Sequence, residues 1–340
     1  MTAIVLHPEI KDAIDRHAPI VVLESAVLTT GLPNRPWDPS WQRDALTQAV
    51  PEWDPDAPLA SQLQHRMEQT VRDHGAVPCT TALIEGRLHL GIDAAEARVL
   101  MADGLGNKVA STTLAMGMGT GLSAGTTVSA ALNACALLRD EVEHDAWAPV
   151  LATGGIGGVH RGWATRPDIS ADLLALSRTR ACVVSAGSKS ILDMIATLEL
   201  LESIAVPVLG WKTERWPAFT SSLPPDTPRI NAIDDLQQLG RICSHHWQDL
   251  AHPSAILLAN PLPAELTVDH QEMEQLTEAA EQAATTQGLD GAARTPFVLG
   301  SIADQTGGRS VAANLALLLG NAQRAAEAAC MLAGPHLANP

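Results

Sequence analysis

The stretch LATGGIGGVHRGWATRPDISADLLALSRTRACVVSAGSKSILD, residues 151–193, contains two short apolar runs that each end in glycine. The first run, residues 149–153, leads into a turn with four glycines at positions 154–158. The second run, residues 181–186, leads through a glycine to Ser-Lys-Ser at 188–190. In α/β proteins, buried strands that end in glycine and lead into helices present functional groups at the carboxyl edge of a sheet. The stretch therefore predicts an α/β fold whose site follows these two runs.

Strand and helix patterns alternate along the rest of the chain. Apolar or alternating runs predict strands at residues 20–28, 206–211 and 255–260 and a hairpin at 79–90. Helical periodicity predicts helices at residues 60–74, 94–101, 126–138, 171–177, 191–201, 269–288 and 310–332, and a loop with weak helix at 108–125. This alternation, with no internal repeat and no clear linker, predicts one α/β layered domain over residues 1–340.

The composition excludes several classes of partner. The 340-residue chain carries a net charge of −16, with 46% apolar and 18% charged residues. This acidic balance argues against nucleic acids and anionic membranes, because both need a basic surface. The five cysteines are widely spaced, no apolar run reaches the about 18 residues of a membrane span, and the N-terminus becomes charged too early for a signal peptide. We therefore expect a cytoplasmic protein with free thiols.

Residues 29–59 contain six prolines and three of the eight tryptophans, Trp37, Trp41 and Trp53. So many prolines exclude a long regular element. We predict a surface loop, with a helix at residues 40–50 capped by Ser40. Loops of this length often serve as functional lids or lack order.

Two ionisable residues lie beside the predicted strands. Lys189 is expected in the first turn of a helix, where the helix N-terminus and apolar walls disfavour an ammonium ion. A neutral amine attacks carbonyl carbon, as in Schiff-base enzymes, although an ordinary surface lysine would give the same pattern. Glu24 interrupts the apolar run 20–28, so it either is buried and paired or faces solvent at a strand end.

Asp168, Ser170 and Asp172 place two carboxylates and a hydroxyl within five residues. Oxygen ligands of this kind suit Mg²⁺ or Mn²⁺, with water completing the coordination shell. The same residues are also suited to cap a helix at 171–177. Capping is the better interpretation for one of them, and a metal remains possible for the other.

The glycine-rich turn at 154–158 leaves backbone N–H groups open to an anion. It has neither the GK[ST] of a P-loop nor the spacing of a dinucleotide fingerprint. His160 and Arg161 follow it and add polar groups suited to phosphate or to sugar hydroxyls.

Ten segments, in order along nearly the whole chain, resemble the pseudouridine-5'-phosphate glycosidase family. They are LES (23–25), GAVP (75–78), GTTV (125–128), ATGGIGGVHRG (152–162), DISADL (168–173), AGSKSILD (186–193), ANPLP (259–263), TPF (295–297), TGG (306–308) and NLAL (314–317). The glycine-rich segment, DISADL and the lysine segment at their spacing form a highly specific signature. On these motifs the chain is identified as a member of the family.

The resemblance implies an α/β/α layered fold with a mixed central sheet, a homotrimer, and chemistry on a C–C glycosidic bond. It also implies a divalent cation, usually Mn²⁺, with Mg²⁺ as the alternative. It assigns Glu24 as the proton donor, Lys189 as the covalent nucleophile and Asp168 as the metal ligand. The substrate contacts that it implies are Lys108, Val128, His160, Ser170, Ala171, Asp172 and Asn314.

Three features depart from the family pattern. Ala26 and Thr30 stand where the family has polar residues, a threonine and a histidine, and residues 110–113 replace a charged segment. The interval between Glu24 and Gly75 is also longer and carries the three tryptophans. These changes suggest a base pocket altered towards a larger, flatter aromatic partner, on which tryptophans would stack. Alternatively, the tryptophans only pack the added loop onto the subunit or a neighbour.

We therefore favour a C-glycosynthase that joins ribose 5-phosphate to an aromatic acceptor, as in antibiotic biosynthesis. The alternative is a pseudouridine-5'-phosphate glycosidase, which releases the nucleobase uracil and ribose 5-phosphate. A non-catalytic sugar-phosphate-binding protein is disfavoured because Glu24, Asp168 and Lys189 are retained.

Overall fold

The computed structural model describes residues 3–32, 34–102, 106–142, 147–165, 167–289 and 294–334. Its strands are β1 (Ile4–Leu6), β2 (Ile20–Leu23), β3 (Val77–Ile84), β4 (Arg87–Leu90), β5 (Lys108–Val109), β6 (Ala124–Thr126), β7 (Val150–Ala152), β8 (Val159–His160), β9 (Cys182–Ser185), β10 (Leu192–Asp193), β11 (Val208–Trp211), β12 (Asn231–Ile233) and β13 (Ile256–Ala259). Its helices are α1 (Pro8–Asp15), α2 (Arg43–Ala49), α3 (Leu59–Asp73), α4 (Ala94–Leu100), α5 (Ser111–Thr120), α6 (Val128–Asp140), α7 (Ala171–Arg178), α8 (Met194–Ser203), α9 (Leu236–Ser244), α10 (His270–Thr286), α11 (Arg294–Gln305) and α12 (Arg309–Ala333).

Within these described ranges, eleven strands form one mixed sheet in the order β1-β4-β3-β2-β7-β9-β13-β11-β12, with β6 joined to β3 and β5 joined to β6. The central strands run parallel to one another in the order β3-β2-β7-β9-β13. Strands β4 and β6 pair with β3 in the antiparallel direction. A separate antiparallel pair joins β8 to β10. Because β2, β7 and β9 are parallel neighbours, the residues that follow them meet at one edge of the sheet.

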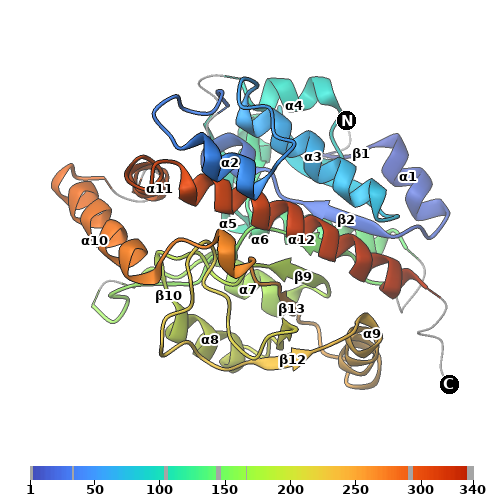
Figure 1. The fold of residues 1–340 in the computed structure, drawn as a ribbon. Helices are drawn as coiled ribbons and strands as arrows, with labels where there is room; N and C mark the ends of the chain where they lie inside the picture. Colours follow the sequence, from blue (N-terminus) through green and yellow to red (C-terminus); the bar gives the residue numbers. More distant parts are fainter. Residues whose placement is uncertain are drawn as a thin grey trace.

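Helices cover both faces of the sheet, as predicted for an α/β/α layered fold. Figure 1 shows α12 crossing one face of the sheet, with α3 alongside it. Val21 and Leu23 of β2 belong to the core on the α12 side, whereas Ile20 and Val22 belong to the core that contains α1, α6, α7 and α8. This alternation is what the two-residue side-chain period of a strand requires when both faces are buried.

Most of the predicted elements are confirmed with small differences at their ends, but some bounds are wrong. The strand predicted at 20–28 ends at Leu23 and gives way to a π-helical turn, Val27–Gly31, because the polar residues leave the sheet. The region 108–125 is more regular than predicted, since it holds β5, α5 and β6.

The helix expected in the proline-rich loop begins at Arg43 and is α2. Its N-cap position is Gln42 and not Ser40, whose hydroxyl donates to Asp38 instead (2.6 Å). Tertiary contacts thus decided where this short helix starts, since Gln42 is held by its backbone N–H to the Gly307 carbonyl (2.8 Å).

The expected free thiols are found, since all five cysteines are unpaired and four of them are buried. In the part of the chain that the structure describes, no helix combines the length and apolar character needed to cross a bilayer. Even α12, which is 25 residues long, is an alanine-rich helix that packs on the sheet.

Candidate active site

A large cavity opens at the carboxyl edge of the central strands. Its volume is about 740 Å³, and residues that follow β2, β7 and β9 line it together with the N-termini of α6 and α7. Helices α11 and α12 and the start of the proline-rich loop close the other side. All nine residues predicted to bind substrate or catalyse the reaction line this one cavity: Glu24, Lys108, Val128, His160, Ser170, Ala171, Asp172, Lys189 and Asn314.

Glu24 lies directly after β2, so its side chain points from the strand end into the cavity wall. One carboxylate oxygen accepts a hydrogen bond from the backbone N–H of Val27 (3.1 Å). Burial raises the pKa of Glu24 above its ordinary value, and the positive charge of Lys189 only partly opposes this effect. A carboxyl group of raised pKa keeps its proton at higher pH, which suits a general acid.

Lys189 lies in the turn after β9, where it lines the same cavity. The expectation that it occupies the first turn of a helix is wrong. Leu192 and Asp193 pair with β8 as strand β10, so the helix starts later, at Met194. A backbone bond from the Lys189 N–H to the Ile156 carbonyl (3.2 Å) connects this turn to the glycine-rich turn.

A second lysine faces the cavity from β5. Burial lowers the pKa of Lys108, and the nearby charge of Lys189 lowers it further, while Asp172 and Glu24 act in the opposite direction. Three charged groups therefore act on the pKa of Lys108 within one site, an arrangement typical of functional sites.

Asp172 is almost completely buried, although it was predicted to contact the substrate. Its two carboxylate oxygens accept hydrogen bonds from the backbone N–H groups of Ser129 (2.9 Å) and Gly157 (2.8 Å). It therefore connects the start of α6 with the glycine-rich turn while still lining the cavity. Ser170 is the N-cap of α7, since its hydroxyl accepts a hydrogen bond from the Asp172 N–H (3.2 Å). This agrees with the interpretation of this segment as a helix cap.

The glycine-rich turn is used for close packing as well as for any ligand. A Cβ atom on Gly157 would collide with the Ser170 hydroxyl and come within 2.8 Å of the Asp172 carboxylate. The N–H groups of Ile156 and Gly157 are taken by protein acceptors. The prediction that the glycines of this turn offer free N–H groups to an anion is therefore wrong for Gly157.

Asn321 was missed by the sequence analysis and bonds to the end of a strand beside the cavity. It lies in the middle of α12, is 1% exposed, and donates to the Thr153 carbonyl at the end of β7 (2.7 Å). Its own carbonyl oxygen accepts from the Asn260 amide (3.0 Å), which follows β13. A buried asparagine within an alanine-rich helix was the available signal, because such a side chain needs polar partners.

Asp168, the predicted metal ligand, lies at the surface beside the cavity. Its side chain is 66% exposed, and one carboxylate oxygen is 4.0 Å from Nδ1 of His160, which lines the cavity. The described residues contain no cluster of three or more histidine, cysteine or acidic side chains that could hold a metal. The donor set fits only a well-hydrated oxygen-liganded ion, such as Mg²⁺ or Mn²⁺ held by one carboxylate.

The three tryptophans of the proline-rich loop are all buried, with 6%, 7% and 6% exposure for Trp37, Trp41 and Trp53. Trp37 and Trp41 pack edge to face, with ring centroids 5.0 Å apart. Of these three tryptophans, Trp41 lines the cavity and Trp37 and Trp53 do not. The indole N–H of Trp41 donates to Asp304 of α11 (3.1 Å). The hypothesis of a stacking surface made of three tryptophans is therefore wrong for Trp37 and Trp53, which pack the loop onto the core.

Comparisons with known proteins find relatives over nearly the whole chain. Residues 55–331 match the family model described as indigoidine synthase A like protein. The chain is 40% identical to the pseudouridine-5'-phosphate glycosidase of Gemmatimonas aurantiaca over 322 residues, which cover 94% of both chains. It is 37% identical to the enzyme of the same name from Deinococcus radiodurans over 325 residues, 95% of this chain and 93% of that one.

Two solved structures share the fold. The prealnumycin C-glycosynthase AlnA, solved in complex with ribulose 5-phosphate, superposes with a TM-score of 0.79 at 29% identity, covering 97% of both chains. An indigoidine synthase A-like protein from Thermotoga maritima gives a TM-score of 0.78 at 29% identity, covering 98% of both chains. The chain therefore belongs to the indigoidine synthase A-like family, whose pseudouridine-5'-phosphate glycosidases and C-glycosynthase are enzymes of the C-glycosidic bond.

Proposed function

We propose that the protein cleaves pseudouridine 5'-phosphate to uracil and ribose 5-phosphate through a covalent intermediate on Lys189. The observation that carries this proposal is the convergence of a raised-pKa carboxyl group, Glu24, with Lys189 in one cavity at the sheet edge. The identity of 37–40% to proteins named pseudouridine-5'-phosphate glycosidase supports the same substrate. The synthase favoured from the sequence has less support, since the synthase relative is 29% identical.

The chemistry follows from the bond to be broken. A C-nucleoside has no heteroatom between C1' and the base, so direct hydrolysis has no leaving group. Glu24 would give its proton to the ribose ring oxygen as the C1'–O bond opens, and Nζ of Lys189 would bond to C1'. The C–C bond then breaks, its electron pair goes to the base carbon, and a proton is added there. The lysine imine that remains is hydrolysed by water to open-chain ribose 5-phosphate.

The surrounding residues would support these proton transfers. Lys108, whose pKa is lowered by burial, adds positive charge at the same cavity as the phosphorylated substrate. Asp172 would keep the start of α6 and the glycine-rich turn at a fixed separation, so that the sugar meets a preformed wall. His160, Ala171, Val128 and Asn314 are proposed substrate contacts because they line the cavity.

A divalent cation would be held by Asp168, with water and substrate oxygens as the remaining ligands. When bound, it would supply positive charge beside His160 and the phosphorylated sugar. Mn²⁺ is the proposed ion and Mg²⁺ the alternative. Replacing Asp168 with Asn should raise the metal concentration needed for half-maximal activity, which a titration of metal-free protein would measure.

C-ribosylation of a larger aromatic acceptor is a second candidate, and the loop side of the cavity favours it. Ala26 and Thr30, which depart from the family pattern, both line the cavity, as do Trp41 and Arg35. The guanidinium carbon of Arg35 lies 5.8 Å from the Trp41 ring centroid. An aromatic face beside a cation suits a flat acceptor that carries negative charge or acidic hydroxyls.

The deciding experiment measures uracil release from pseudouridine 5'-phosphate in the presence of Mn²⁺. We expect turnover by the natural protein, loss of turnover in Lys189→Ala, and full activity in Lys212→Ala, which removes an exposed lysine. Borohydride added with ribose 5-phosphate should attach the sugar to residue 189. Failure of the natural protein to release uracil, with trapping intact, would favour the synthase instead. Trapping on another residue would contradict the assigned nucleophile.

We also propose that the protein forms a homotrimer and is located in the cytoplasm. Exposed apolar side chains on neighbouring elements, Ile169, Leu174 and Ile195, would be covered in an oligomer. Light scattering after gel filtration should give three times the chain mass of 35.8 kDa. Cytoplasmic placement is supported by the free cysteines.

A further inference from the structure

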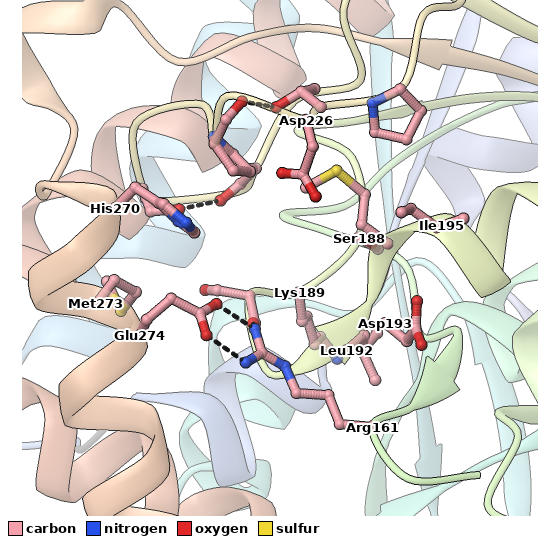
Figure 2. Close-up of a pocket in the computed structure, with 17 residues that line it drawn as sticks. Arg161, Ser188, Lys189, Leu192, Asp193, Ile195, Asp226, His270, Met273 and Glu274 are labelled. Carbon is pink, nitrogen blue, oxygen red and sulfur yellow. Dashed lines mark hydrogen bonds and ion pairs between the residues drawn. The ribbon is translucent and has the colours of Figure 1, made fainter. Parts of the chain in front are cut away.

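The turn that carries Lys189, residues 188–192 and here called the lysine strap, has a cavity on each side. Beside the candidate active site lies a second cavity of about 400 Å³, and Lys189, Ser190 and Leu192 line both. Figure 2 shows the second cavity, with Lys189 and Leu192 in its wall. Ser188, Ile191 and Leu192 of the strap are buried, whereas Lys189 and Ser190 are only partly buried. The position of Lys189 and Ser190 therefore depends on hydrogen bonds as well as on packing.

Arg161 supplies one such bond from outside the strap. Its guanidinium group donates to the Ser190 carbonyl, one residue after the lysine (3.1 Å). The same guanidinium group donates to both carboxylate oxygens of Glu274, each at 2.6 Å. Figure 2 shows this bidentate ion pair beside Lys189. Arg161, which the sequence suggested for phosphate or sugar hydroxyls, thus makes contacts within the protein.

Glu274 connects the strap to a second part of the fold. It lies on α10, which packs against α11 around a small core of its own. Ile191 and Leu192 of the strap are buried in that core beside Met273 and Val298. Helix α10 thus holds the strap through apolar side chains on one flank and through Glu274 and Arg161 on the other.

The opposite charges of this pair hold its two side chains together. Glu274 neutralises Arg161, and the hydrogen bond to Arg161 in turn lowers the pKa of Glu274, so both stay charged and bonded. The bidentate geometry fixes the direction in which Arg161 reaches the strap.

We propose that Arg161, oriented by Glu274, is a positioning residue that holds the lysine strap so that Lys189 reaches C1' of the sugar. The sugar named in this proposal rests on the proposed function, whereas the contact between Arg161 and Ser190 is observed in the structure. Both side chains of the ion pair are partly exposed, at 40% and 33%, so the pair contributes little to overall stability. Variants at these positions are therefore expected to fold.

The first test measures the strap directly, without substrate. Hydrogen–deuterium exchange of peptides that contain residues 188–192 should be faster in Arg161→Ala and in Glu274→Gln than in the natural protein. The matched control is Arg229→Ala, which breaks an exposed arginine–glutamate pair elsewhere. Gln275→Ala, at an exposed position on the same helix, controls for changes in α10. Unchanged exchange in both Arg161→Ala and Glu274→Gln would overturn the proposal, whatever the substrate.

The second test measures catalysis of uracil release. We expect kcat of Arg161→Ala to fall about ten- to a hundred-fold, since small misplacements of a reacting group have effects of that size, with KM nearly unchanged. Added guanidinium at sub-denaturing concentration should restore part of the rate, and Arg229→Ala should show neither effect. A rise in KM with unchanged kcat would make Arg161 a binding residue and overturn the proposal. If the natural protein itself releases no uracil, the proposed function fails, whereas the exchange experiment still decides the role of Arg161.

Discussion

The two sides of the large cavity are held in place by different kinds of interaction. On the strand-end side, buried polar side chains bind backbone atoms: Asp172 holds Gly157, and Asn321 holds Thr153. On the loop side, residues 34–58 are fixed by buried tryptophans, of which Trp37 and Trp41 pack at the junction of α11 and α12. The side-chain hydrogen bonds of this segment are exposed or only partly buried, as is the bond from Trp41 to Asp304. A hydrogen bond to the backbone requires one side-chain geometry, whereas an apolar contact tolerates replacement by another apolar side chain of similar volume. The difference shows how one side can keep its chemistry while the other changes its partner.

Among changes that retain Lys189, replacing Glu24 should have the largest effect on catalysis. We expect Glu24→Gln to lower kcat for uracil release by about 10²- to 10⁴-fold, because the amide cannot donate the acid proton. The rate of the natural protein should fall as the pH rises through the raised pKa of Glu24. A pH–rate profile of kcat tests both points, and an unchanged alkaline limb in the variant would argue against Glu24 as the acid.

The same substitution should affect stability in the opposite direction. Because burial raises the pKa of Glu24 above 4.5, the folded state disfavours its carboxylate, and this cost is absent below pH 4.5 and grows as the pH rises through the raised value. Glu24→Gln removes the charge, so its Tm at pH 7 should equal or exceed that of the natural protein. The difference should vanish near pH 4.5. A lower Tm at pH 7 would mean that the ionised form is stabilised instead.

Gly308→Ala should affect the loop side alone. The backbone φ of Gly308 is +82°, and a Cβ there would lie 2.6 Å from the Trp37 ring and 2.8 Å from Trp41. We expect a loss of about 2–4 kcal/mol, from left-handed strain plus overpacking. The matched control is Gly288→Ala, which has φ +67° and no atom within 4 Å, and should lose about 1–2 kcal/mol. Urea unfolding measures both; equal losses would show that the tryptophans do not press on Gly308.

Asp172→Asn should affect stability and chemistry together. The amide group keeps the shape but leaves one buried backbone N–H without an acceptor, at a cost of about 1–3 kcal/mol. The glycine-rich turn should shift, so borohydride trapping of ribose 5-phosphate should slow as well. The exposed Asp168→Asn is the control and should leave the unfolding free energy unchanged. A stable Asp172→Asn with normal trapping would remove the contrast between the two sides.

The smallest effect is expected for Trp41→Phe. It keeps an aromatic ring but loses the bond to Asp304, at a cost of about 0.5–1.5 kcal/mol. Trapping of ribose 5-phosphate should be unchanged, whereas KM for the aromatic partner should rise, since Trp41 lines the cavity. Trp53→Phe, buried away from the cavity, should leave KM unchanged. An equal slowing of trapping would show that the loop side also positions the sugar.

Much of the fold could be predicted from the sequence because its strands are continuous apolar runs and its helices have clear periodicity. The hairpin around Glu85-Gly86 is an example, since its two strands and turn lie close together in the chain. The start of the helix after Lys189 could not be predicted, because it depends on pairing with β8, about thirty residues earlier in the chain. Local patterns contain no information about such distant partners.

For the candidate site, too, some features could be read from the sequence and others depended on the tertiary structure. The sequence by itself determined the α/β class, the family, and the presence of carboxyl groups at Glu24 and Asp168 and of an amine at Lys189. Only the tertiary structure decided that Asp172 and Asn321 bind backbone atoms, that Trp37 and Trp53 are core, and that Arg161 reaches the lysine strap. The reason is physical: residue type fixes what a side chain is able to do, but burial and contacts between distant segments fix which of its possible partners it meets.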